Sequence, residues 1–391
     1  MIIAGHARWE SAPLAGLTEV PTILIDDLTD AEMKAFTIAD NRLAELASWD
    51  DAQLAQQLLE LATLVPDLDL ELTGFDVGEI DFRIESLRRP AQNEVPDEAD
   101  GIAVPAGPPV TKPGDVWNLG PHRILCGDAR DAASYGALLG ADRARAVFTD
   151  APYNVRIDGH ASGLGKIRHR EFAMAAGEMT AAQYTNFLTT VFGHLGAYCA
   201  DGSIIYTSLD WRHLVEFHTA ARAVGFRLLN VAVWVKHTPG MGSFYRSQHE
   251  LILVLKTGRG SHRNNIELGQ HGRNRSNAWF YRGANDFARG DGETNALASH
   301  PTPKPVAMVA DAIMDCTARG DIVLDAFLGG GATLIAAERT GRRCFGIDID
   351  PIYVDTAVRR WQAWTRNTAH HAVSGRSFDA VPAQKERRRG R

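Results

Sequence analysis

The sequence predicts an α/β fold, in which a Rossmann-like, doubly wound and mostly parallel sheet follows a small α+β N-terminal module. Two features predict the sheet. After residue 114, short apolar runs alternate with longer stretches of helical periodicity, as in parallel strands that are joined by helices. The chain of 391 residues is also 45% hydrophobic, which is enough for the core of such a sheet.

The N-terminal module contains two apolar stretches, 1–4 and 20–25, that have the pattern of strands. Residues 40–42 have the composition of a turn or helix cap. Asp50 or Asp51 can cap a helix, because the leucines that follow recur at helical spacing.

A linker is predicted at residues 90–113, which are rich in Pro, Gly and acidic residues and lack periodicity. It separates the module, residues 1–89, from a main domain at 114–370, and 371–391 forms a basic tail. Residues 1–100 hold 22 acidic and 6 basic residues, whereas the remainder holds 26 and 35. We therefore expect the two parts to have different partners, since a basic domain can attract a polyanion.

The main domain contains seven apolar runs that we expect to be strands. They are Arg123–Cys126, Ala146–Phe148, Ser203–Tyr206, Val231–Val235, Leu251–Leu255, Ile322–Leu324 and Cys344–Ile347.

Cysteine spacing and hydropathy argue against several classes of protein. The four cysteines lie far apart without a CxxC pair, so neither a zinc cluster nor a disulfide framework is expected. No apolar run approaches the roughly 20 residues of a membrane span, and the first residues lack the pattern of a secretory signal. We expect a cytoplasmic protein without a membrane partner.

A glycine-rich turn follows the predicted strand that ends before Asp325. Gly329 and Gly331 allow the backbone to approach a ligand closely, and the preceding acid suits a cofactor with a cationic amino-acid end, such as S-adenosylmethionine. Asp348, at the tip of the next strand, can accept hydrogen bonds from both hydroxyls of a ribose. A plain strand–helix connection is the alternative, while a dinucleotide fits less well because the third glycine of GxGxxG is missing.

The predicted strand at 146–148 leads into the segment Asp150-Ala151-Pro152-Tyr153. This segment resembles the Asp-Pro-Pro-Tyr motif of amino-group DNA methyltransferases, with Ala151 in place of the first proline. The resemblance implies that the Asp150 carboxylate and the Ala151 carbonyl accept hydrogen bonds from an exocyclic amine, which favours the pyramidal nitrogen needed for attack on a methyl sulfonium. It also implies that Tyr153 stacks on a base flipped out of the duplex. A strand-ending turn is the alternative.

The segment precedes the glycine turn, an order that resembles the β class of amino-methyltransferases. Further matches to that class are Gly127-Asp128, the segments 234–236 and 249–250, and His300 to Pro305; the resemblance covers residues 114–365. The S-adenosylmethionine-binding residues that it implies are Asp128, Thr302, Lys304, Asp325, Phe327, Gly329, Gly331 and Asp348.

Two basic segments are candidates for DNA contact. Residues 256–299, in the position of the target-recognition region, hold seven basic and four acidic residues around the aromatic run 279–281. The loop 156–171 is expected to close over the flipped base or the phosphates. The candidate DNA-binding residues are Arg168, Arg170, Arg273, Arg275 and Arg282. Solvated loops are the alternative in both places.

Residues 1–85 resemble the later part of a ParB-like domain through Gly5-His6-Ala7-Arg8, Asp40-Asn41-Arg42 and the segment 45–50. The first strands and helix of that domain are not found, so we expect a docking or regulatory role, or a vestigial module.

Together these resemblances predict a site-specific DNA methyltransferase that uses S-adenosylmethionine to methylate adenine N6 in double-stranded DNA. Cytosine N4 and RNA are alternative targets, and a non-enzymatic ParB-like DNA-associated regulator is the alternative class. A homodimer is possible by resemblance to the β class.

Overall fold

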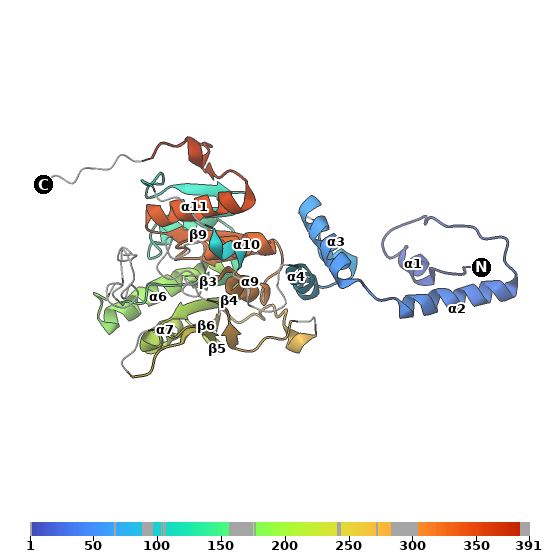
Figure 1. Cartoon of the computed structure of the whole chain (residues 1–391), viewed down its shortest axis with the longest axis horizontal. Coiled ribbons are helices and arrows are strands. Elements are labelled where there is room, and N and C mark those ends of the chain that lie inside the picture. Colours follow the sequence, from blue (N-terminus) through green and yellow to red (C-terminus); the bar gives the residue numbers. More distant parts are fainter. Residues whose placement is uncertain are drawn as a thin grey trace. The chain divides into compact units, whose positions relative to one another are not determined.

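The computed structural model describes residues 2–65, 68–87, 97–102, 104, 107–155, 175, 177–240, 244–270, 273–282 and 304–383. The chain forms two compact units, Met1–Gln57 and Leu58–Arg391. Figure 1 shows the sheet of the second unit with its helices. None of the helices within these ranges combines the length and hydropathy required to cross a membrane.

The described strands of the second unit form one ten-stranded sheet in the order β10-β1-β2-β9-β8-β3-β4-β6-β5-β7. Only β1 and β6 run antiparallel to their neighbours. The strands are β1 (Val116–Leu119), β2 (His122–Cys126), β3 (Ala144–Thr149), β4 (Cys199–Leu209), β5 (Arg227–Val235), β6 (His249–Lys256), β7 (Ala278–Phe280), β8 (Ile322–Asp325), β9 (Arg343–Asp348) and β10 (His370–His371). All seven predicted strands are present.

Helices cover both faces of this sheet (Figure 1). Side chains of α9 (Val306–Met314), α10 (Ala332–Thr340) and α11 (Pro351–Thr365) share one hydrophobic cluster with the strands. Those of α5 (Ala132–Leu139), α6 (Ala181–Tyr198) and α7 (Leu214–Ala223) share the other. Along β3 the side chains alternate, so that Phe148 joins the first cluster and Val147 the second. The predicted doubly wound α/β fold is therefore confirmed.

The regular elements of the first unit are helices: α1 (His6–Ser11), α2 (Asp30–Leu46) and the beginning of α3 (Asp51–Leu64). The structure has no strand at residues 2–4, within the predicted strand 1–4, or at 20–25, because no partner strand pairs with them among the described residues. The predicted turn at 40–42 is wrong, since these residues lie inside α2, which begins with a capping box at Thr29. Asp50 caps α3 through the N–H groups of residues 52 and 53, as predicted.

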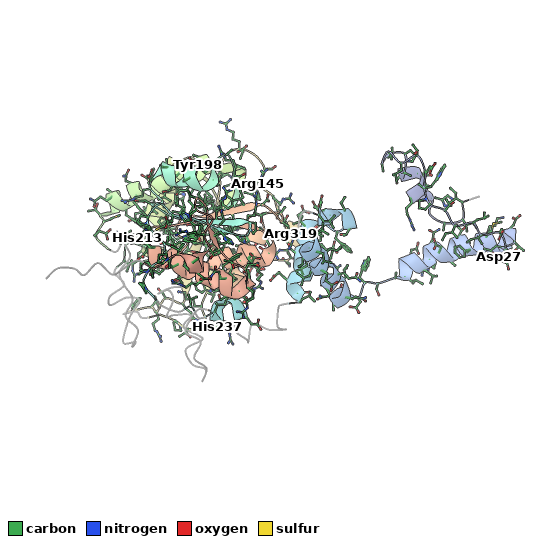
Figure 2. The ribbon with its side chains drawn as sticks, turned by 90° about the horizontal axis from the view of Figure 1, so that it is seen from above. Asp27, Arg145, Tyr198, His213, His237 and Arg319 are labelled. Atoms are coloured by element: carbon green, nitrogen blue, oxygen red, sulfur yellow. The ribbon has the colours of Figure 1, made fainter. Side chains whose placement is uncertain are left out.

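Helix α4 (Val77–Ser86) belongs to the second unit and packs on the sheet domain through buried ion pairs. Asp81 binds Arg342, just before β9, at 2.6 Å and Arg319 at 3.2 Å, and Glu85 binds Arg339 of α10 at 2.5 Å. Figure 2 shows Arg319 on the flank of the sheet domain where α4 lies. These contacts move the division between the units from the predicted linker to residues 57–58.

Parts of the predicted linker and tail are also packed. The N–H groups of Val110 and Thr111 donate to the buried carboxylate of Asp355. At the other end, Phe378 is buried against Trp117, with ring centroids 5.0 Å apart. The packed domain thus extends beyond 114–370 on both sides, because apolar and hydrogen-bonding side chains within these segments reach the sheet. The remaining short helices are η1 (Leu70–Thr73), η2 (Glu98–Gly101), η3 (Trp211–His213), η4 (Glu267–Gly269) and η6 (Phe378–Ala380).

Candidate active site at the carboxyl edge of the sheet

The catalytic segment and the glycine turn meet at one edge of the sheet. Strands β3 and β8 are parallel neighbours, with Ala146 opposite Val323. Just beyond the paired residues, Thr149 Oγ1 donates a hydrogen bond of 3.1 Å to Oδ1 of Asp325. Two segments that are far apart in the sequence therefore lie side by side, at the edge where open α/β sheets bind ligands.

Asp150 lies in a cluster of charged and phenolic side chains. Its Oδ2 accepts a hydrogen bond of 2.6 Å from Lys304 Nζ, and its Oδ1 accepts one of 2.5 Å from the Tyr153 hydroxyl. Glu250, on β6, binds the same ammonium group at 3.0 Å and lies 3.2 Å from the same hydroxyl. Lys236, at the end of β5, forms an ion pair with the other oxygen of Glu250. Two carboxylates thus share two ammonium groups.

This pairing sets the ionisation of the cluster. Burial and the Glu250 carboxylate raise the pKa of Asp150, although the Lys304 ammonium opposes them. Burial alone would raise the pKa of Glu250 as well, but Lys304 and Lys236 outweigh it and lower the pKa to about 2. The two carboxylates in turn raise the pKa of Lys304 against the effect of its own burial. Glu250 thus has two ammonium partners, Lys236 and Lys304, whereas Asp150 binds Lys304 and the Tyr153 hydroxyl.

The backbone of the catalytic segment is fixed from α6 and the loop before it. The Tyr184 hydroxyl donates a hydrogen bond of 2.8 Å to the carbonyl of Pro152, and Ala151 is buried in the hydrophobic cluster below. Asn154 has a φ of 53° and bonds through its side chain to the N–H and carbonyl groups of Met179. These contacts hold the turn even though Ala151 stands where the motif has its first proline.

Asp325 is buried beneath the glycine turn. Besides Thr149, its carboxylate accepts hydrogen bonds from the Phe327 N–H at 3.0 Å and from Thr333 Oγ1 at 2.7 Å. Burial raises its pKa to about 6 against the effect of these three donors. Asp325 therefore ties the end of β3, the turn and the start of α10 together.

The glycine turn has the backbone that its sequence predicts. Gly329 and Gly331 have φ values of 51° and 80°, in the left-handed region that side chains disfavour. A Cβ on Gly331 would also lie 3.0 Å from that of Ala357 on α11. Only glycine fits there without displacing α11.

Asp348 ends β9 beside this turn. Its two oxygens accept hydrogen bonds from the N–H groups of Gly329 at 2.8 Å and Asp350 at 2.9 Å. Burial raises its pKa to about 7, against the effect of both donors. Asp128 follows the neighbouring strand β2, is partly exposed and pairs with Arg130 at 2.6 Å. The predicted cofactor residues on the strand ends thus share one edge.

Other predicted site residues are placed differently. Lys304 was expected to bind S-adenosylmethionine, and in the structure its ammonium group contacts Asp150 and Glu250. Thr302, Arg168 and Arg170 lie outside the described residues.

The prediction of DNA contact is wrong for Arg273 and Arg275. Arg273 pairs with Asp315 at 2.5 Å, and Arg275 pairs with Asp311 at 2.9 Å; all four side chains are largely buried. Both arginines therefore hold the segment before β7 on α9, and their guanidinium groups are not offered to a ligand. Arg282 is half-buried, and its role stays a prediction.

Glu250, Lys236 and Tyr184 were not predicted as site residues. A signal for the first two exists in the sequence, since a charged residue flanks each of two apolar strands that form a hairpin. Tyr184 had no such signal, because its place on the apolar face of α6 is typical of a core aromatic.

Searches for similar proteins give partial matches. The Type II methyltransferase M2.DpnII of Streptococcus pneumoniae is 29% identical over 167 residues, which are 41% of this chain and 60% of that protein. The Type II methyltransferase M2.LlaDCHI of Lactococcus lactis subsp. cremoris is 27% identical over 164 residues, 40% of this chain and 59% of that protein. The chain thus spans about 60% of the length of these curated relatives.

Solved structures with similar folds include the M1.HpyAVI–SAM complex, with 19% identity and a TM-score of 0.44 over 61% of this chain and 97% of that one. TTHA0409 of Thermus thermophilus, a putative DNA modification methylase complexed with S-adenosyl-L-methionine, has 23% identity and a TM-score of 0.44. The match covers 66% of this chain and 96% of that one. The cytosine-N4-specific PvuII DNA methyltransferase has 15% identity and a TM-score of 0.46 over 65% and 88%.

Two family models match the chain. The model of a ParB-methyltransferase HTH domain matches residues 52–113, which include α4 and all of α3 except its first residue. The N6/N4 methyltransferase model, described as DNA methylase, matches residues 144–359, more than half of the chain and every residue of the Asp150 cluster. Members of this family use S-adenosylmethionine. The chain belongs to the DNA methylase family whose members methylate adenine N6 or cytosine N4.

Proposed function

We propose that the chain transfers a methyl group from S-adenosylmethionine to N6 of an adenine flipped out of double-stranded DNA. The hydrogen bond between Thr149 and Asp325 supports this proposal most directly, because it holds the catalytic segment against the glycine turn.

The strand ends suit S-adenosylmethionine, which supplies a methyl group activated by a sulfonium. The Asp348 carboxylate has lone pairs left for ribose hydroxyls, since each oxygen accepts one recorded backbone hydrogen bond. Gly329 and Gly331 let the cofactor lie close to the backbone, and the half-buried ring of Phe327 offers an apolar contact. Asp325 is enclosed by its three donors, so it supports the turn and adds negative charge near a cationic cofactor.

The Asp150 cluster suits the activation of an exocyclic amine. Such a nitrogen is a poor nucleophile because its lone pair is delocalised into the ring. Asp150 can accept an amine hydrogen bond in place of the one from the Tyr153 hydroxyl. The ring of Tyr153 can then stack on the base. Positioning of the amine next to the methyl group and electrostatic stabilisation then supply the rate enhancement, without a covalent intermediate.

Adenine is the proposed base because of the acid at position 150. In the amino-methyltransferases that the segment resembles, cytosine-N4 enzymes usually carry serine there. Cytosine N4 is the second candidate. A cytoplasmic location, a homodimer and a docking role for the N-terminal module are further proposals.

Nucleoside mass spectrometry tests the proposed base. Unmethylated genomic DNA would be incubated with the chain and S-adenosylmethionine and then digested. We expect N6-methyladenine, absent from a control without the cofactor. N4-methylcytosine alone would contradict the choice of base, and DNA binding with no modified nucleoside would favour a non-enzymatic regulator. Sequencing the modified DNA would also identify the recognition site.

A further inference from the structure

The hairpin between β5 and β6 presents two aromatic rings to solvent. Phe244 and Tyr245 are 86% and 84% exposed, although their ring centroids lie only 4.4 Å apart. Contiguous exposed apolar patches on a protein surface can mark a binding site. By contrast, Trp279, in the segment where the sequence predicted DNA contact, is buried in the core.

The stem of this hairpin is held by its own hydrogen bonds. The Lys236 N–H donates to the Gln248 carbonyl at 2.9 Å, and the Gly240 N–H donates to the Ser247 carbonyl at 2.8 Å. The Arg246 guanidinium, next to the aromatic pair, donates to the carbonyls of Pro239 and Gly240, both at 2.9 Å. These hydrogen bonds join residues 236–240 to residues 246–248, which directly follow the two rings.

The hairpin stands at the edge of the sheet that carries Asp150. Because β5 runs parallel to β3, the carboxyl ends of both strands reach the same edge. The stem joins the catalytic cluster directly, since Lys236 pairs with Glu250 and Glu250 shares Lys304 with Asp150. Tyr245 is five residues from Glu250, so the Cα atoms of these two residues are at most about 18 Å apart.

The charge of the hairpin indicates which kind of partner it fits. Lys236 is already paired with Glu250, but residues 237–249 contain His237, Arg246 and His249 and no acidic residue. Basic groups around exposed aromatic rings are suited to a partner that combines phosphates with stacked bases. A partner protein with a purely apolar surface would gain nothing from the basic residues of the hairpin.

We propose that Phe244 and Tyr245 form an aromatic wedge that enters the base stack of duplex DNA next to the target and fills the space left when the target base flips out. This inference rests on the proposed function and adds to it how the base leaves the duplex. Inserted apolar side chains unstack base steps in other DNA-binding proteins, and stacking of bases on the rings offsets the lost base–base stacking.

The test compares one variant on two substrates. The first substrate is a duplex oligonucleotide carrying the site that the wild-type protein methylates. The second is the same duplex with an abasic position opposite the target base, which is then unpaired from the start. We expect F244A/Y245A to lower kcat/KM at least about tenfold on the paired duplex, and less than about threefold on the duplex with the abasic position.

The control is Phe82→Ala, which removes a 41% exposed aromatic side chain from α4 and should leave both rates at the wild-type value. If F244A/Y245A matches the wild type on the paired duplex, or loses the same factor on both substrates, the wedge is refuted. A wild-type protein that methylates no DNA would refute the proposed function instead, so the two failures are distinguishable.

Discussion

At the scale of single residues, the site depends on how carboxylates are shared. The sequence predicted Asp150, Asp325 and Asp348 from their positions after apolar strands, and all three lie at the same edge. It could not predict that Lys304 would bind Asp150, because that contact joins residues 154 apart in the chain. Nor could it predict that Arg273 would be buried, since a basic residue in a polar segment has the same pattern whether it meets DNA or an aspartate on a helix.

Asp348 provides a prediction at this scale. Its folded pKa of about 7 exceeds the ordinary value of 3.8, so its contribution to stability is full below about pH 4 and is lost as the pH rises through about 7. Ribose hydroxyls donate to the ionised form of Asp348, so the affinity for the cofactor has the opposite pH dependence to the stability. We expect the affinity for S-adenosylmethionine to fall as the pH is lowered from 8 to 5.5, by up to about tenfold per unit below the pKa.

Isothermal titration calorimetry in two buffers of different ionisation enthalpy would measure both the affinity and the proton released. Asp348→Asn should bind weakly at every pH, without the pH dependence. An unchanged wild-type affinity across this range would mean that Asp348 does not titrate with binding.

At the scale of elements, the pattern of apolar residues was sufficient to predict the strands that are covered by helices on both faces of the sheet. It failed for 20–25 in the first unit, where an apolar run has no partner strand among the described residues, and for 40–42, where α2 continues through polar residues. The pattern also could not show that α4 would attach to α10, because the ion pairs that hold it link residues far apart in the chain.

The ion pairs of α4 lead to a stability prediction. Asp81 is 1% exposed and is the recorded carboxylate partner of the fully buried Arg342. Asp81→Ala leaves that charge without its counter-ion, so we expect the free energy of unfolding to fall by about 3–5 kcal/mol. Urea denaturation followed by tryptophan fluorescence would measure it. Glu71→Ala, at an exposed position of η1, is the control and should change the value by less than about 0.5 kcal/mol. Equal stability of the two variants would show that α4 is not held by this pair.

At the scale of the whole molecule, function depends on the order of strands in the sheet. Because β3 lies between β8 and β4, residues from both halves of the catalytic domain reach one edge. The sequence predicted this convergence only through its resemblance to a family, since no local pattern specifies which strands are neighbours. The aromatic hairpin was not predicted, because exposure of Phe244 and Tyr245 is a property of the folded chain.

The most direct test of this account separates cofactor binding from methyl transfer in Asp150→Asn. The substitution keeps the shape of the side chain, and Glu250 keeps Lys304 paired. We expect S-adenosylmethionine to bind within about threefold of the wild-type affinity, while single-turnover transfer to DNA slows by at least about 100-fold. Transfer at the wild-type rate would contradict the claim that Asp150 and the glycine turn form one active site.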